Sequence, residues 1–334
     1  MSVRLDALRG EAITGSLLLE HYESLTVIPP EIAAINARVE AAAAGTPRLD
    51  EVDDAERARA GRAATFSHEP RRSREAIGGG VDVAIFSPLE RRARGVYLHF
   101  HGGGWVIGSA FGQSDARLQK LADDSALHVV SVDYALAPEH RWPKPLEDCV
   151  AAFEWLAANA EARFETTALT AGGESSGAHL CVAAYLKAPS RASYRALNLV
   201  YGFYDLARTR DFARRLVFTA EELEWFAEQL EPDASRRAAP DVSPLRADLP
   251  PDLPPALFSV GTADALLDDT LLLAQRWTGD AELVVYPGAA HGLGHFGPHE
   301  STAQGADLNG RVAAFLEAHA DPAPCETWAG GPGY

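Results

Sequence analysis

Cysteine is scarce in this sequence, and the scarcity narrows the class of protein. The three cysteines, Cys149, Cys181 and Cys325, stand far apart in 334 residues and lack the spacing of metal ligands. A disulfide framework or a zinc site needs cysteines that are more numerous or more closely spaced, so neither is expected. Cys149 and Cys181 each fall in an apolar helical stripe, which predicts that they are small core residues.

Long apolar runs are lacking as well. No stretch approaches the roughly 20 apolar residues of a membrane-spanning helix. The opening residues mix charged and apolar side chains and have no apolar core like that of a signal peptide. We therefore expect a cytoplasmic protein with no membrane partner.

Basic residues are outnumbered by acidic ones, 30 against 47, which gives a formal net charge of −17. This excess of negative charge repels nucleic acids and anionic membranes, so the expected partner is a small molecule. The chain is long enough to bury a large core, either as one domain or as a domain with an added cap.

Apolar runs typical of strands alternate with amphipathic segments from about residue 74 onward. Helices between strands predict parallel pairing, crossovers over both faces of the sheet, and ligands at the carboxyl ends of the strands. Three glycines, residues 78–80, are expected to turn an earlier short strand back onto the first of these. The predicted strands are residues 81–87, 95–100, 128–134, 167–171, 198–202, 256–260 and 282–286.

Residues 205–245 interrupt this alternation with a helical segment and no predicted strand. Thr219 and Glu222 have the spacing of a capping box, which marks the start of a helix. Trp225 falls outside the apolar stripe of that helix. Two interpretations stay open for its side chain, which are packing beneath the insertion and lining of a pocket.

The segment Gly173-Glu174-Ser175-Ser176-Gly177 fits the G-x-S-x-G pattern. It follows a predicted strand and opens a predicted helix, as a sharp turn that exposes a nucleophilic serine does. Such a turn strains the serine backbone and leaves no room for neighbouring side chains, which explains the two glycines. The pattern predicts Ser175 as the nucleophile.

The segment His101-Gly102-Gly103-Gly104-Trp105 directly follows another predicted strand. Consecutive glycines allow backbone N–H groups to point at an oxyanion without obstruction. We expect the N–H groups of Gly103 and Gly104, with that of Ser176, to form an oxyanion hole. The alternative is a glycine-rich turn that binds nothing.

These two motifs, with residues 132–140, resemble the bacterial hormone-sensitive-lipase-like esterases, a branch of the α/β-hydrolases. The resemblance spans about residues 74–318. Glu174 and Ser176 differ from the Asp or Thr and the Ala that are usual in the family. The resemblance implies an α/β-hydrolase fold with a mostly parallel eight-stranded sheet, helices on both faces and a helical cap.

The same resemblance implies a division of the chain. Residues 1–70 would be an N-terminal helical cap segment and residues 205–245 a cap insertion. Residues 71–204 and 246–320 would form the catalytic domain, with residues 321–334 as a C-terminal tail. The resemblance further implies a preference for short acyl groups in the substrate, no cofactor and a possible homodimer.

His291 is the predicted general base. In this fold the order along the chain is serine, acid, histidine, and His291 lies just after the last predicted strand. His295 is the alternative. The spacing of His291, His295 and His299 suggests a metal, but glycines and a proline interrupt the series, so no metal is expected.

Asp264 is the predicted acid, because it ends a strand and turn whose carboxyl end faces the site. The resemblance also aligns it with the family's acid. Asp268 and Asp269 are competitors that are better explained as structural or solvated carboxylates at the start of the next helix.

The sequence thus predicts a serine carboxylesterase that hydrolyses short-chain acyl esters through Ser175, His291 and Asp264 by way of an acyl-enzyme. Trp105 and Trp225 are candidate substrate-binding residues. The same residues would also serve a lactonase, an amidase or deacetylase, or an acyltransferase. A binding protein without catalysis on the same scaffold is the alternative from a different class.

Overall fold

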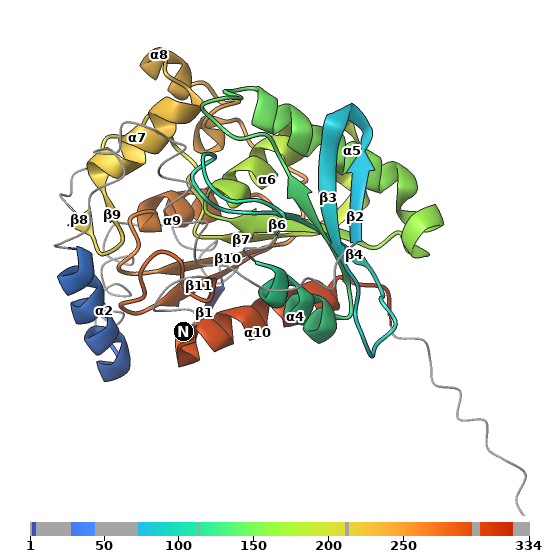
Figure 1. Cartoon of the computed structure of the whole chain (residues 1–334), viewed down its shortest axis with the longest axis horizontal. Helices are drawn as coiled ribbons and strands as arrows, with labels where there is room; N and C mark the ends of the chain where they lie inside the picture. Colours follow the sequence, from blue (N-terminus) through green and yellow to red (C-terminus); the bar gives the residue numbers. More distant parts are fainter. Residues whose placement is uncertain are drawn as a thin grey trace, which may run out of the picture.

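The structure, a computed structural model, describes residues 2–4, 28–43, 73–111, 114–210, 214–295 and 301–322. A nine-stranded sheet forms its centre, in the order β1-β11-β10-β7-β6-β4-β5-β3-β2 (Figure 1). The bounds are β1 Ser2–Arg4, β2 Ser73–Ile77, β3 Val81–Phe86, β4 Val96–Phe100, β5 His128–Asp133, β6 Leu169–Glu174, β7 Tyr194–Val200, β10 Ala256–Gly261 and β11 Ala281–Tyr286.

Six neighbouring strands of this sheet pair in parallel, in the order β11-β10-β7-β6-β4-β5. Antiparallel pairing within the sheet is confined to its edges. β2 and β3 form the predicted antiparallel hairpin across Gly78–Gly80, and β3 pairs antiparallel with β5. These eight strands, β2 to β11, are the predicted mostly parallel sheet. At the opposite edge β1, which the sequence analysis did not predict, pairs antiparallel with β11.

Two strand boundaries differ from the prediction by three residues or more, and the others differ by at most two. β6 runs on to Glu174 instead of ending at Ala171, because backbone groups of Gly172 and Gly173 pair with strands on both sides. Ladder hydrogen bonds need no side chain, so glycines that signal a break in the sequence continue the strand here. β7 begins at Tyr194 rather than Asn198, with Arg195 exposed between buried neighbours.

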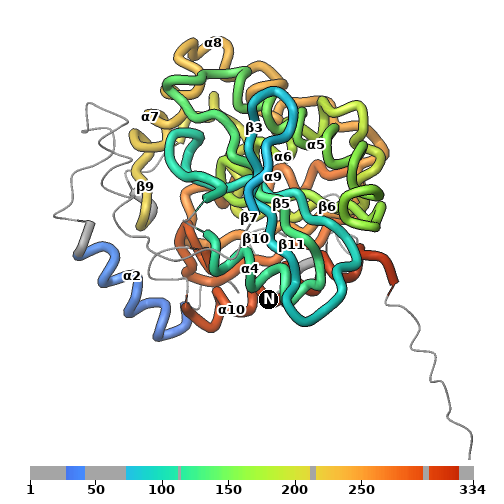
Figure 2. Tube along the Cα trace, turned by 45° about the vertical axis from the view of Figure 1, so that its right-hand side comes forward, coloured from blue at the N-terminus to red at the C-terminus, as the bar shows by residue number. Residues whose placement is uncertain are grey.

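Helices cover both faces of the sheet. Helices α5 and α6 pack together on one face, whereas α4 and α10 pack together on the other (Figures 1 and 2). The helices are α2 Pro30–Ala43, α4 Asp115–Ser125, α5 Lys144–Phe164, α6 Ser176–Lys187, α7 Ala220–Leu230, α8 Ala234–Arg237, α9 Leu267–Arg276 and α10 Ala303–Ala318, with short 3₁₀ turns η3 Gly78–Gly80, η4 Pro189–Ser193 and η5 Pro244–Arg246.

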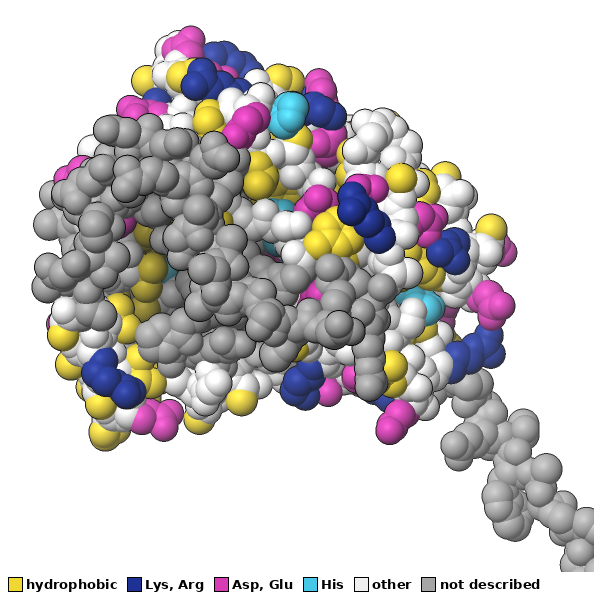
Figure 3. Space-filling view, viewed as in Figure 1, with side chains coloured by type: hydrophobic (Ala, Val, Ile, Leu, Met, Phe, Trp, Pro, Cys, Tyr) yellow, Lys and Arg dark blue, Asp and Glu magenta, His cyan; other side chains and the backbone are white. Residues whose placement is uncertain are grey.

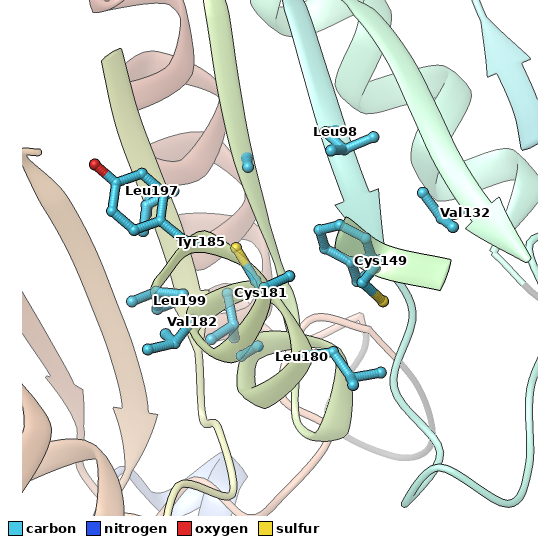
Figure 4. Close-up of a cluster of buried hydrophobic side chains, with 14 of the residues drawn as sticks. Leu98, Val132, Cys149, Leu180, Cys181, Val182, Tyr185, Leu197 and Leu199 are labelled. Carbon is cyan, nitrogen blue, oxygen red and sulfur yellow. The ribbon is translucent and has the colours of Figure 1, made fainter. Parts of the chain in front are cut away.

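The core beneath α5 and α6 contains the cysteines predicted to be there. Cys149 and Cys181 are buried free thiols, surrounded by Leu98, Val132 and Leu197 from the sheet (Figure 4). Burial raises the pKa of both thiols, so they stay protonated. Cys325 lies outside the described residues.

The insertion at residues 205–245 does contain strands, contrary to the prediction. Arg214–Arg215 (β8) and Phe218–Thr219 (β9) pair antiparallel, with Leu216 in the left-handed region at φ 51°. Strands of two residues are too short to show an alternating pattern. The capping box was predicted correctly: Glu222 N donates to Thr219 Oγ1 at 3.1 Å, and Thr219 N donates to Glu222 Oε2 at 2.9 Å.

The N-terminal segment is described only in part. Helix α2 lies on the same side of the molecule as β9 in both views (Figures 1 and 2). Asn36 Nδ2 donates to Gly288 O at 2.9 Å, which ties α2 to the loop after β11. Residues 44–72 and the tail from residue 323 lie outside the described residues.

Charges of both signs are scattered over the described residues of the face shown in Figure 3. Among the helices that the structure describes, none combines the length and the apolarity needed to cross a membrane. The cytoplasmic location stays a prediction.

Candidate active site

Ser175 lies on the sharp turn between β6 and α6. Its backbone has φ 57° and ψ −121°, a conformation that costs a non-glycine residue energy. A Cβ on Gly177 would lie 2.0 Å from the carbonyl oxygen of Phe100, so a side chain there would push the helix away from β4. The turn therefore has the geometry that the G-x-S-x-G pattern predicts.

Ser175, His291 and Asp264 form one hydrogen-bonded chain. His291 Nε2 lies 3.0 Å from Ser175 Oγ, and its Nδ1 lies 2.9 and 3.0 Å from the two carboxylate oxygens of Asp264. Asp264 follows β10 and also accepts the Leu266 N–H at 2.8 Å. With Nδ1–H donating to the carboxylate, Nε2 is left as an acceptor for the serine hydroxyl.

The alternative residues for base and acid have other partners. His295 pairs with the Tyr201 hydroxyl, and burial lowers the pKa of its imidazole well below the usual range. Asp268 pairs with Arg208 at 3.0 Å. Asp269 accepts the N–H groups of Tyr204 and Asp205 at 2.9 and 3.0 Å.

No metal-like cluster occurs in the part of the chain that the structure describes, where no three His, Cys, Asp or Glu side chains are grouped to hold an ion. His299, the third histidine of the series that suggested a metal, lies outside the described residues.

The glycine turn after β4 faces the serine turn. Gly103 and Gly104 have φ values of 123° and 60°, which favour glycine, and Gly103 O accepts the N–H of Ile107 at 2.9 Å. Within the described chain the N–H groups of Gly103, Gly104 and Ser176 have no acceptor. Three donors beside the serine are therefore available to a bound oxyanion.

Residues of β5 and the loop after it hold this turn in place. Tyr134 Oη donates to the carbonyl of His101 at 2.6 Å. Asp133 Oδ1 accepts the Ser109 hydroxyl at 2.7 Å and the Ala110 N–H at 2.8 Å. The turn that carries the donors is thus fixed from outside as well as by its own hydrogen bonds.

The comparison with known families decides the identity of the fold. A family model described as the alpha/beta hydrolase fold matches residues 97–295. This range contains Ser175, Asp264, His291 and the glycine turn. The chain belongs to the α/β-hydrolase fold family.

Named relatives of this α/β-hydrolase are ester hydrolases. The chain is 31% identical over 231 residues to the carboxylic ester hydrolase LipN of Mycobacterium tuberculosis, covering 64% of this chain and 61% of the relative. It is 32% identical over 228 residues to an ethyl acetate hydrolase of Pseudomonas putida, covering 64% of this chain and 71% of the relative. The chain thus aligns with less than two thirds of the length of LipN.

A solved structure with the same fold is a hyperthermophilic esterase from Pyrobaculum calidifontis. It superposes with a TM-score of 0.74 and 25% identity, covering 87% of this chain and 98% of the archaeal one.

The two candidate substrate-binding tryptophans have packing roles in this α/β-hydrolase. Trp105 is fully buried, and its Nε1 donates to His179 Nδ1 at 3.1 Å. Its ring also packs 5.2 Å from that of Phe203, and a contact with substrate stays a prediction. Trp225 is half-buried, and its ring packs 5.1 Å from that of Phe226.

Two phenylalanines of the insertion lie at the site instead. The Phe218 ring centroid is 5.1 Å from that of His291. The Phe226 ring packs so closely on Gly104 that a Cβ there would lie 2.2 Å from it. The sequence analysis assigned neither residue to the site, because their long-range neighbours leave no signal near them in the chain.

Glu174 and Arg117 are the other members of the site that the sequence analysis did not predict. Glu174 directly precedes the nucleophile and is buried. Its Oε2 lies 2.9 Å from His99 Nε2, and its Oε1 lies 3.1 Å from Arg117 Nη2. The available signal was a charged residue directly before the predicted nucleophile.

Proposed function

We propose that this protein is a serine carboxylesterase that hydrolyses short-chain acyl esters. The hydrogen-bonded chain Ser175–His291–Asp264 on a strained turn is the observation that carries the proposal. The esterase relatives support the same reaction class.

Proton transfer starts the reaction. His291 Nε2 takes the proton of the Ser175 hydroxyl as Oγ attacks the ester carbonyl carbon. Asp264 holds the imidazole in the tautomer that has a free Nε2 and stabilises the imidazolium that forms. All three side chains are buried, which strengthens this electrostatic stabilisation.

The tetrahedral oxyanion would lie among the free N–H groups of Gly103, Gly104 and Ser176. Each such donor is worth roughly 3–4 kcal/mol of barrier, judged from other oxyanion holes. The imidazolium then protonates the leaving alcohol, and an acyl group stays on Ser175. Water, deprotonated by His291, attacks that acyl group and releases the acid and the free serine. No step requires a metal or a cofactor.

The insertion would limit the size of the acyl group. Phe218 lies against His291, and Phe226 lies against Gly104, so two large rings border the reacting groups. We assign residues 205–245, with the N-terminal segment up to about residue 70, to a cap over the catalytic domain. Large rings beside the reacting groups would leave more room for a short acyl chain than for a long one. A homodimer remains part of the proposal.

The test is hydrolysis of p-nitrophenyl esters from acetate to palmitate by the wild type and by Ser175→Ala in parallel. The expected result is activity that falls with acyl length and is absent from the folded variant. A folded wild type that hydrolyses none of these esters would overturn the esterase proposal. Amides, lactones or binding without turnover would then be examined on the same residues.

A further inference from the structure

Glu174 joins three parts of the molecule from a buried position next to the nucleophile. His99 belongs to β4 and Arg117 to α4, and both lie on the carboxylate. The third partner is the backbone of the glycine turn, because Gly102 N donates to Glu174 Oε1 at 3.3 Å. One carboxylate therefore contacts the turn that holds two of the oxyanion donors.

The carboxylate is held in its ionised form. Burial by itself raises the pKa of a carboxyl group, but the charge of Arg117 and the hydrogen bond from His99 outweigh it here. The pKa of Glu174 consequently lies well below its usual range. His99 then donates from Nε2, and its Nδ1, 2.9 Å from Ser131 Oγ, serves as an acceptor.

The glycine turn and the serine turn touch each other at Glu174. A Cβ on Gly102 would lie 3.0 Å from the Glu174 carbonyl oxygen and 3.4 Å from the Ser175 Cβ. Gly102 leads directly into Gly103 and Gly104, and Glu174 leads directly into Ser175 and Ser176. The Glu174 carboxylate thus lies between the two backbone segments that carry the oxyanion donors.

We propose that Glu174 is a positioning residue that fixes the glycine turn relative to the nucleophile by accepting the Gly102 N–H. The inference rests on the proposed esterase function and adds a residue that neither donates to the substrate nor transfers its proton. A displacement of about 1 Å in such a site costs on the order of 100-fold in rate. The hydrogen bond therefore has a kinetic consequence beyond its contribution to stability.

A purely structural role would predict a different result, so the test must separate the two. Removing the Glu174 charge alone would leave Arg117, whose side chain is 14% exposed, without its partner. We therefore compare Glu174→Gln with Glu174→Leu, each combined with Arg117→Met. In that background neither variant leaves a lone buried charge, and the two differ in whether residue 174 can accept the Gly102 N–H.

The expected result is a kcat about 10- to 100-fold lower for the Leu variant than for the Gln variant, with KM within about threefold. Affinity for a trifluoromethyl ketone, which adds to the serine and places an oxyanion in the hole, should fall by the same factor. The matched control is Glu154→Leu, because Glu154 accepts the Ser190 N–H at 2.9 Å and its hydroxyl at 2.6 Å on α5, away from the site. It should lower the melting temperature and leave kcat unchanged.

Equal kcat and equal ketone affinity for the Gln and Leu variants would overturn the positioning role while the esterase proposal stands. If the Leu variant does not fold, the Glu174→Gln/Arg117→Met variant, compared with wild type, carries the test through the same two measurements. It keeps the acceptor, so its kcat should stay within about fivefold of wild type, and a larger fall would overturn the proposal. A wild type that neither hydrolyses esters nor binds the ketone would overturn the proposed function and this role together.

Discussion

Two buried histidines, His291 and His99, each lie between a carboxylate and a serine hydroxyl. His291 contacts Asp264 at 2.9 Å and Ser175 at 3.0 Å. His99 contacts Glu174 at 2.9 Å and Ser131 at 2.9 Å. By residue type and by distance, the two sets are nearly the same.

The surroundings of the two serines are different. Ser131 lies inside β5 with no exposed surface, whereas Ser175 stands on a strained turn at the end of β6 with 9% of its surface exposed. Among the described residues, the N–H groups of Gly103, Gly104 and Ser176 in the two turns at Ser175 have no acceptor. An acid–histidine–serine set therefore indicates catalysis only where a substrate can reach the hydroxyl and where N–H groups can receive the developing charge.

The largest expected effect comes from replacing Ser175, and it distinguishes this serine directly from Ser131. Ser175→Ala should lower kcat on p-nitrophenyl acetate by about 10⁶-fold, as loss of the nucleophile does in other serine hydrolases, with the fold retained. The measurements are steady-state hydrolysis and circular dichroism. A folded variant that keeps more than about 1% of the activity would contradict the assignment of the nucleophile.

The second-largest expected effect comes from replacing Asp264, the carboxylate that contacts His291. Asp264→Asn should lower kcat by about 10⁴-fold, because the amide no longer fixes the correct tautomer of His291. Asp268→Asn is the matched control, since this carboxylate is 62% exposed and pairs with Arg208. We expect its activity to stay within about twofold of wild type. Steady-state kinetics of both variants measure the difference. Similar losses of kcat for Asp264→Asn and Asp268→Asn would argue against Asp264 as the acid.

A third histidine, His179, extends the comparison, because none of the carboxylates that the structure describes is bonded to it. His179 accepts from Trp105 on Nδ1, its Nε2 lies 2.8 Å from the carbonyl of Val242, and burial lowers its pKa to about 4. An unfolded histidine has a pKa near 6.5, so between pH 6.5 and 4 the unfolded chain binds the proton and the folded chain does not. The free energy of unfolding should therefore fall by up to about 3 kcal/mol as the pH drops through that range.

Glutamine at position 179 offers one acceptor and one donor for the same two partners and does not titrate. Urea unfolding of the wild type and of His179→Gln at pH 7.0 and 4.5 measures the difference. The gap in stability between the two proteins should shift in favour of the glutamine variant at the lower pH. An unchanged gap would show that His179 does not titrate differently in the folded chain.

The smallest expected effect is on the buried serine. Ser131→Ala removes one hydrogen bond to His99 and should cost about 1 kcal/mol of stability. Its kcat should stay within about twofold of wild type, because Ser131 has no contact with the reacting groups. Thermal unfolding and ester hydrolysis test the two parts. A loss of activity as large as that of Ser175→Ala would mean that the two sets cannot be told apart by their surroundings.

Local features of the sequence predicted much of the fold. Strand and helix periodicity placed the sheet, and the two glycine motifs placed the turns at the ends of β4 and β6, because steric limits on the backbone act between neighbours in the chain. The same locality explains the correct capping box at Thr219. Chain order singled out His291 and Asp264. The structure places His291 on Ser175, 116 residues away in the chain, and Asp264 on His291, 27 residues away.

Other features were decided by packing between distant segments. Trp105 follows the glycine motif and was a candidate substrate-binding residue, and only the structure shows that His179, 74 residues away, accepts its indole N–H. From the sequence, Glu174 is only a departure from the usual residue of its motif. In the structure it pairs with Arg117 of α4, 57 residues away in the chain. The sequence by itself determined the backbone turns, since these depend on the residues in them. The tertiary structure alone decided which side chains the turns meet, because burial and hydrogen bonding depend on all the segments that pack around each position.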